Sequence, residues 1–224
     1  MGPPPMKTLF PTQPSSCSPR RDSHHAPAGF SLVEMVIVVA IVTMLIALAT
    51  PYTLAALQSA NLTSAGDTLM QKLAMAQQRS LTENRPVGLD FYYYTEDDIK
   101  GCHAIQMISY NPATNQATQL EPPVYFNKQS VVLVEGALSP MFSTNQTATS
   151  TGPATWNPFQ TLGATFYRVI FYPNGTTSLR TPLRTAYLTL ISTKNFKPDI
   201  STAPPNYYTV QLDPVTGRGH SYRP

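Results

Sequence analysis

The chain has 224 residues, a length typical of one to one and a half domains. Charged residues make up only 12%, about half the usual share in soluble proteins, and the net charge is +3. This charge balance argues against a dedicated nucleic-acid-binding domain, and 2 cysteines are too few for a disulfide framework or a cysteine-rich zinc site. The 22 prolines and 12 tyrosines suit short strands and irregular loops better than a helical bundle.

Residues 1–29 form a polar leader, rich in Pro and Ser, that carries Lys7, Arg20 and Arg21 but no apolar run. Met6 is an alternative to Met1 as the start of this leader. An ordinary secretory signal has its apolar region directly behind the basic residues and ahead of the cleavage site, so the order here is different.

Residues 30–49 follow with the run FSLVEMVIVVAIVTMLIALA, which contains one charged residue. Twenty residues at about 1.5 Å each span about 30 Å, the thickness of a bilayer hydrocarbon core. The alternative is the buried helix of a large globular core, but such helices are rarely apolar on every face over this length. Because basic residues precede the run and none follows directly, we expect a single membrane span over 30–50, a cytoplasmic N-terminus and an exported remainder.

Glu34 is unusual because a carboxylate in a membrane helix costs about 2–3 kcal/mol if it is central, and it usually marks function. The alternative is that Glu34 lies at the lipid headgroups and is merely tolerated. No Lys or Arg lies between Arg21 and Lys72 to pair with it. Cleavage between Gly29 and Phe30 would release an α-amino group with a pKa near 8, one helical turn before Glu34. That amine could pair with Glu34 of the same helix or of a neighbouring subunit.

The run GFSLVEM at residues 29–35 resembles the processing site of type IV prepilins and type II secretion pseudopilins. The resemblance implies that a membrane-embedded prepilin peptidase cuts after Gly29 and methylates the new terminal Phe30. It also implies that Glu34 is the assembly glutamate. Pro51 resembles the family's proline at the end of the transmembrane half-helix, and a proline there is expected to kink the helix.

A second helical half is expected over residues 51–84. Apolar residues recur there at spacings of three to five and predict one buried stripe, which packs on the protein's own sheet: Leu54, Leu57, Leu62, Ala65, Leu69, Leu73 and Ala76. Pro86 disfavours helical backbone at Arg85, so the helix should end around Glu83.

Residues 85–224 are expected to form an exported, β-rich domain. Runs rich in Val, Ile, Tyr, Phe and Thr predict strands over 87–94, 103–110, 130–134, 165–172, 186–191 and 207–212. Turn signals separate them at 111–112, 173–175 and 213–217, and Asn174-Gly175 predicts a tight hairpin. One long helix followed by antiparallel strands gives an α+β fold class. The resemblance implies the pilin-like version, in which the second half of the long N-terminal helix packs on an antiparallel β-sheet.

Two further stretches of sequence resemble particular groups within this family. The run NRPV at 84–87, together with FYPNG at 171–175, resembles H-type minor pseudopilins more than major pilins. The run QLDPVTGR at 211–218 also resembles the D-component prepilin-like proteins of the Verru/Chthon cassette.

Residues that could carry chemistry are few. Only His103 and His220 would remain after cleavage; both are expected on the surface, and no Gly-x-Ser-x-Gly elbow accompanies them. The run EDD at 96–98 lacks the alternating ligands and the glycine of a calcium loop, so a solvated acidic turn is expected. Cys102 would be left as a single exported cysteine, buried or free. We therefore expect no catalytic site, metal or cofactor, and hence no enzyme.

Two features suit binding, though less well than a structural role. Trp156 lies in a predicted surface loop over 143–163, where it is expected to anchor the loop on the sheet. Four arginines could form a weak basic patch for nucleic acid if the strands bring them together: Arg180, Arg184, Arg218 and Arg223. Nucleic acid is nonetheless disfavoured as a partner, because the mature charge is close to neutral.

We expect a structural subunit, minor rather than major, of a type IV pilus-like filament or a type II secretion pseudopilus. Its partners would be prepilin peptidase, other pilin or pseudopilin subunits, the inner-membrane assembly machinery and membrane lipid. Its C-terminal domain would lie in the periplasm or outside the cell. The alternative is a membrane-anchored, β-rich binding module outside the cytoplasm that does not polymerise.

Overall fold

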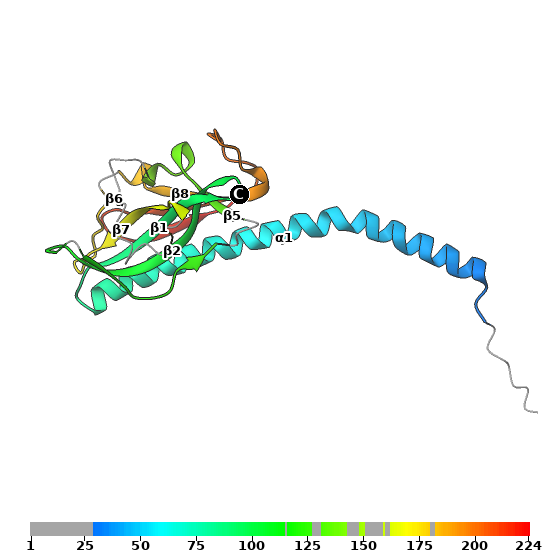
Figure 1. Cartoon of the computed structure of the whole chain (residues 1–224), viewed down its shortest axis with the longest axis horizontal. Coiled ribbons are helices and arrows are strands. Elements are labelled where there is room, and N and C mark those ends of the chain that lie inside the picture. The colour runs from blue at the N-terminus through cyan, green and yellow to red at the C-terminus, as the bar shows by residue number, and fades with distance from the viewer. Residues whose placement is uncertain are drawn as a thin grey trace, which may run out of the picture. The chain divides into compact units, whose positions relative to one another are not determined.

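The computed structural model describes residues 29–114, 116–126, 131–142, 148–150, 159, 162–179 and 182–224. The chain divides into two compact units, residues 1–47 and 48–224. The long helix α1 (Leu32–Thr82) begins in the first unit and ends in the second (Figure 1). Ten strands are described in the second unit: β1 (Val87–Glu96), β2 (Ile99–Asn111), β3 (Gln116–Gln119), β4 (Val124–Tyr125), β5 (Val131–Val134), β6 (Ala148–Ser150), β7 (Thr165–Phe171), β8 (Tyr187–Ser192), β9 (Tyr207–Leu212) and β10 (Gly219–Tyr222).

The strands form one antiparallel sheet in the order β10-β9-β8-β5-β2-β1-β7-β6, and β3 and β4 pair with β2 on its edge away from β1. The β1–β2 hairpin is its longest pairing. The turn between these strands places both Asp97 and Asp98 at positive φ, 50° and 61°, the backbone of a tight hairpin turn. The predicted acidic turn at 96–98 is thus a hairpin turn.

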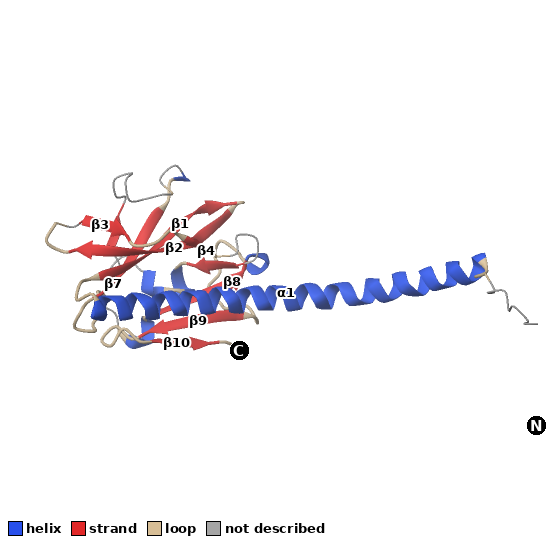
Figure 2. Cartoon of the chain, turned by 90° about the horizontal axis from the view of Figure 1, so that it is seen from below, coloured by secondary structure: helices blue, strands red, loops and turns tan. Residues whose placement is uncertain are grey.

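The second half of α1 packs on one face of this sheet, beside β9 and β10 (Figure 2). Five residues of the predicted stripe are buried against the inward side chains of β1, β2, β7, β8 and β9: Leu62, Ala65, Leu69, Leu73 and Ala76. Leu54 and Leu57 are exposed instead, at 52% and 59%. The prediction was wrong for these two leucines because helical periodicity shows which side of the helix is apolar, but not how far the sheet beneath it extends.

Two polar contacts also hold the helix on the sheet. Arg223, after β10, donates to the backbone oxygen of Ser59 at 3.1 Å. Lys72 forms an ion pair of 2.7 Å with Glu121, in the segment between β3 and β4. The C-terminal Arg223 is therefore used to hold α1 rather than to build a basic patch.

The helix ends at Thr82, next to the predicted end. The amide of Glu83 closes the last turn by donating to Arg79 at 2.8 Å. Asn84 then adopts φ 48°, the left-handed backbone that commonly terminates helices and that Asn tolerates better than most residues. Pro86 follows two residues later, where it cannot continue the helix.

The six predicted strands correspond to β1, β2, β5, β7, β8 and β9. The predicted turn after β7 is confirmed as well: Gly175 has φ 84°, the Tyr172 amide donates to the Thr176 carbonyl at 2.9 Å, and Phe171 bridges to Thr177. The strands β3, β4, β6 and β10 were not predicted. They are short, between 2 and 4 residues, and three of them carry mostly polar side chains.

The opposite face of β1, β2 and β7 is also buried. Phe159, from the predicted loop, packs against Tyr92 and Tyr94 with ring centroids 4.7 and 5.3 Å apart. Trp156, which was expected to anchor this loop, lies outside the described residues. The central strands are therefore covered on both faces, which explains the almost unbroken burial along β1 and β2.

Candidate functional site

The predicted cleavage junction lies just before the helix. Gly29, Phe30 and Ser31 have no helical assignment, and α1 begins at Leu32 with the Met35 amide donating to the Ser31 carbonyl at 3.1 Å. Phe30 is 75% exposed, and a Cβ built on Gly29 would meet no atom within 4 Å. Exposed, non-helical backbone is the kind of segment that proteases bind and cut.

Glu34 lies in the first turn of α1 and is exposed. A carboxylate in that turn interacts favourably with the unpaired amides and the positive end of the helix dipole. Among the residues that the structure describes, Glu34 forms no ion pair. The pairing of Glu34 with a new Phe30 amine stays a prediction.

The first half of α1 is apolar on every side, and nothing in the described part of the chain covers it. Every residue from Gly29 to Thr50 is exposed. This is the helix that is long and apolar enough to cross a membrane. An uninterrupted apolar surface of this length is not stable in water, so this segment needs lipid or other apolar helices around it.

The helix continues through Pro51, which lies inside the bounds of α1. Proline has no amide proton, so the carbonyl of Ala47, one turn earlier, loses its normal intrahelical donor. The kink expected at Pro51 stays a prediction.

The remaining candidates for chemistry do not form a site. His103 was expected on the surface but is buried, at 1% exposure, with Nε2 3.0 Å from the Ile99 carbonyl and its ring 4.9 Å from that of Tyr94. That expectation was wrong because β2 is covered on both faces. His220, on the edge strand β10, is exposed as predicted.

Cys102 is a buried free thiol, and burial raises its pKa, so it is not a nucleophile at neutral pH. Among the residues that the structure describes, His, Cys, Asp and Glu form no group of three that could hold a metal. Of the four arginines considered for a basic patch, Arg180 lies outside the described residues, and Arg223 binds α1.

Sequence reasoning missed a buried ion pair between β1 and β7. Asp90 in β1 and Arg168 in β7 lie directly opposite each other, with Nε–Oδ1 and Nη2–Oδ2 distances of 2.6 and 2.7 Å. Burial raises the pKa of the Asp90 carboxyl, and the bidentate Arg168 guanidinium opposes that rise. One charged residue inside each of two strongly apolar strands was the available signal.

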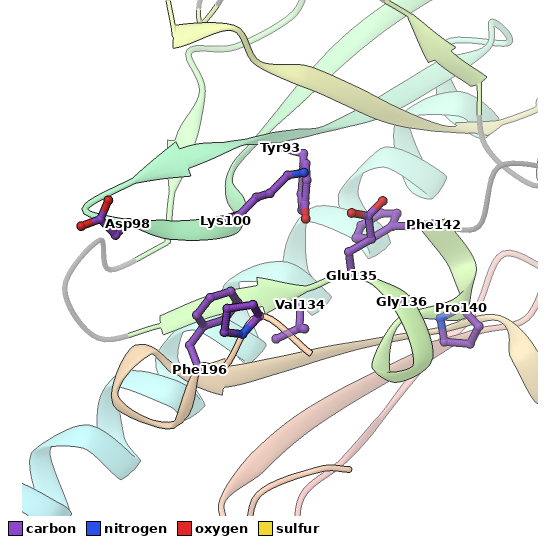
Figure 3. A pocket seen from close by; sticks show the side chains of 10 residues that line it. Tyr93, Asp98, Lys100, Val134, Glu135, Gly136, Pro140, Phe142 and Phe196 are labelled. Atoms are coloured by element: carbon purple, nitrogen blue, oxygen red, sulfur yellow. The ribbon is translucent and has the colours of Figure 1, made fainter. Parts of the chain in front are cut away.

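A pocket between the β1–β2 hairpin and the end of β5 was also missed. It has a volume of about 630 Å³ and is lined by side chains that include Tyr93, Lys100 and Glu135 (Figure 3). No sequence motif marks it, because the residues come from separate segments that only the sheet brings together.

Comparison with known proteins identifies the N-terminal segment. Residues 25–50 match the family model of the prokaryotic N-terminal methylation motif. No curated protein matches the chain in sequence.

Two solved structures are similar in fold. One is the minor pseudopilin EpsH from the type 2 secretion system of Vibrio cholerae, at 9% identity and a TM-score of 0.40, covering 73% of this chain and 98% of that one. The other is the type IV minor pilin FimU of Pseudomonas aeruginosa, at 14% identity and a TM-score of 0.38, covering 73% and 92%. Both TM-scores lie below 0.5, and the two likenesses concern the fold alone. The N-terminal segment of this chain therefore carries the prokaryotic N-terminal methylation motif, at residues 25–50.

Proposed function

We propose that this chain is a structural subunit of a type IV pilus-like filament or a type II secretion pseudopilus, assembled through the first half of its N-terminal helix. The observation that carries the proposal is the methylation motif at 25–50, which coincides with a helical segment whose apolar side chains are all exposed. A helix of this kind is stable in lipid as a precursor and among identical or related helices in a filament. A structural subunit of this kind needs no catalytic residues.

Processing is the first step in this proposal. Prepilin peptidase removes residues 1–29 and methylates the amine of Phe30, for which the exposed, non-helical junction is a suitable substrate. The new amine is cationic at neutral pH and lies one turn from Glu34. In the apolar centre of a helix bundle this pairing removes the cost of an isolated carboxylate and helps to set the register of neighbouring subunits.

The proposed topology follows from charge. The basic leader keeps the N-terminus in the cytoplasm, residues 30–50 cross the inner membrane, residues 51–84 form the amphipathic half of the helix, and residues 85–224 form the exported domain. The partners are prepilin peptidase, other pilin or pseudopilin subunits, the inner-membrane assembly machinery and lipid. We assign the chain to the minor subunits, in keeping with its resemblance to the H-type pseudopilins.

The N-terminus of protein purified from native membranes tests this function directly. Mass spectrometry should find N-methylated Phe30 as the first residue. Gly29→Val is the matched variant: a Cβ at residue 29 meets nothing within 4 Å, so the domain should fold as before while the leader is retained. A wild-type chain that keeps its leader would contradict the proposal. So would a processed chain that never co-fractionates with sheared filaments, the result expected of an anchored, non-polymerising binding module.

A further inference from the structure

The pocket named above exists because two neighbouring strands barely pair. Among the described residues, β2 and β5 share one ladder pair, Cys102 with Leu133, so the β1–β2 hairpin lies on one side of an opening and the end of β5 on the other (Figure 3). Gly101 allows this close crossing, because a Cβ there would overlap Cγ2 of Val132. The opening is thus built into the sheet, and its volume of about 630 Å³ is large enough for a side chain from another molecule.

The lining combines aromatic walls with an excess of negative charge. Tyr93, Phe142 and Phe196 supply the aromatic surface. The charged lining groups are the carboxylates of Glu135 and Asp98 and the ammonium of Lys100. Two negative charges against one positive charge favour a cationic ligand over an anionic one.

Glu135 is positioned by neutral donors. The Tyr167 hydroxyl donates a hydrogen bond to its Oε1, and Tyr167 is itself held by Phe142, whose ring stacks on it with centroids 4.7 Å apart. Burial, with a further contribution from hydrogen bonding to Glu135, raises the pKa of both Tyr93 and Tyr167, so both hydroxyls stay protonated as donors. No ion pair of Glu135 is found within the described ranges of the chain. Its negative charge is therefore oriented but not neutralised.

One cation of the chain already lies against the aromatic lining of the pocket. The ammonium nitrogen of Lys100 lies 5.7 Å from the centroid of the Tyr93 ring, within the usual range of a cation–π contact. Lys100 is exposed on the rim, so its ammonium can move into water when another cation enters. A guanidinium or ammonium entering the pocket would meet the aromatic face and the Glu135 carboxylate together.

We propose that this pocket binds the cationic side chain, arginine or lysine, of a neighbouring subunit in the filament. The site is formed by Glu135, Tyr93 and Phe196, with Lys100 as the cation that is displaced. Only the identity of the partner rests on the proposed function; the chemistry of the site does not.

A titration of the processed, full-length protein in detergent micelles tests the proposal. The probes are Nα-acetyl-arginine amide, Nα-acetyl-lysine amide and the uncharged Nα-acetyl-citrulline amide, followed by NMR shifts of Tyr93 and Lys100. We expect saturable binding of a cationic probe in the millimolar range and binding of the citrulline probe about tenfold weaker. Equal binding of the citrulline probe, or no saturable shift with either cationic probe up to about 100 mM, would overturn the proposal.

Single-residue variants distinguish an effect of charge on probe binding from an effect on folding. Glu135→Gln keeps an acceptor for the tyrosine hydroxyls and should weaken binding of the cationic probe about tenfold. Glu83→Gln removes the same charge from an exposed residue just after α1 and should leave the binding of the cationic probe unchanged. Lys100→Met alters only an exposed rim residue and should tighten binding, because no internal cation competes. Unchanged affinity in both pocket variants would overturn the proposal even if the chain is processed and enters filaments normally, so this inference can fail while the proposed function stands.

Discussion

Gly66 is the only glycine in α1, and its replacement tests how the helix packs on the sheet. A Cβ at this position would lie 2.5 Å from Cγ, Cδ1 and Cε1 of the Tyr208 ring on β9. Carbon atoms in contact normally lie about 3.5–4.0 Å apart, so Gly66→Ala forces the ring or the helix to move by about 1 Å. Tyr208 is 4% exposed and belongs to the main core, so the ring has little room to move.

The expected loss of stability follows from three contributions. Overpacking a core costs about 1–3 kcal/mol. Displacing the ring also weakens the hydrogen bond of 2.9 Å from the Tyr208 hydroxyl to Asp67, and a hydrogen bond to a charged group contributes about 1.5–3 kcal/mol. Alanine is more favourable than glycine in a helix by about 1 kcal/mol, which offsets part of this loss. We therefore expect Gly66→Ala to lower the free energy of unfolding by about 2–4 kcal/mol, or Tm by about 5–15 °C.

Thermal unfolding of the full chain in detergent, followed by near-ultraviolet circular dichroism, measures this shift. Ala74→Gly, on the exposed side of the same helix, is the control for helix propensity alone and should cost about 1 kcal/mol. In a Tyr208→Leu background the ring is absent, so Gly66→Ala should become neutral or stabilising. If Gly66→Ala raises Tm in the wild-type background, the helix does not pack on Tyr208 as described.

Four other outcomes are expected. Glu34→Ala should abolish incorporation into sheared filaments while leaving cleavage after Gly29 largely intact, and normal incorporation would remove the proposed role of Glu34 in assembly. Arg168→Met should lower the free energy of unfolding, measured in urea, by about 3–5 kcal/mol, because it leaves Asp90 charged and unpaired in the core. The double variant Asp90→Leu with Arg168→Met should recover most of that loss. Equal stability of the single and the double variant would refute this account. Hydrogen bonds from Thr216 and from the Val215 amide hold the pKa of Asp213 below its ordinary value of 3.8. The stability that these hydrogen bonds contribute is present above that pH and is lost as the pH falls through the pKa of the folded state. A midpoint at or above 3.8 in an NMR titration of the Asp213 carboxyl would contradict this prediction. The Cys102 thiol should react with an aromatic disulfide reagent only after unfolding, and rapid labelling of the native, processed protein would show that it is not buried.

Short-range sequence patterns were enough to predict the elements that depend only on residues close together in the chain. The methylation motif, the continuous apolar run after it and the helix end before Pro86 are all short-range features, and the structure places the helix end at Thr82. The six predicted strands were equally clear because β-branched and aromatic residues cluster in them. The four missed strands are short, and an edge strand is recognised by its pairing partner more than by its own composition.

The predictions that were wrong concern which residues are buried and how far along α1 the sheet extends. His103 is buried beside Tyr94, on which Phe159 stacks in turn, and no local pattern reports this second covering layer. Leu54 and Leu57 share the periodicity of Leu62 but lie beyond the reach of the sheet.

The sequence by itself determined the apolar character of the first helical half, the methylation motif and the order of helix and strands, because these depend on hydropathy and on short runs of residues. Only the tertiary structure decided which strands are neighbours, and with them the Asp90–Arg168 ion pair, the contact of Gly66 with Tyr208 and the pocket around Glu135. Asp90 and Arg168 are 78 residues apart, and such contacts are fixed by the packing of the whole sheet rather than by the preferences of either segment.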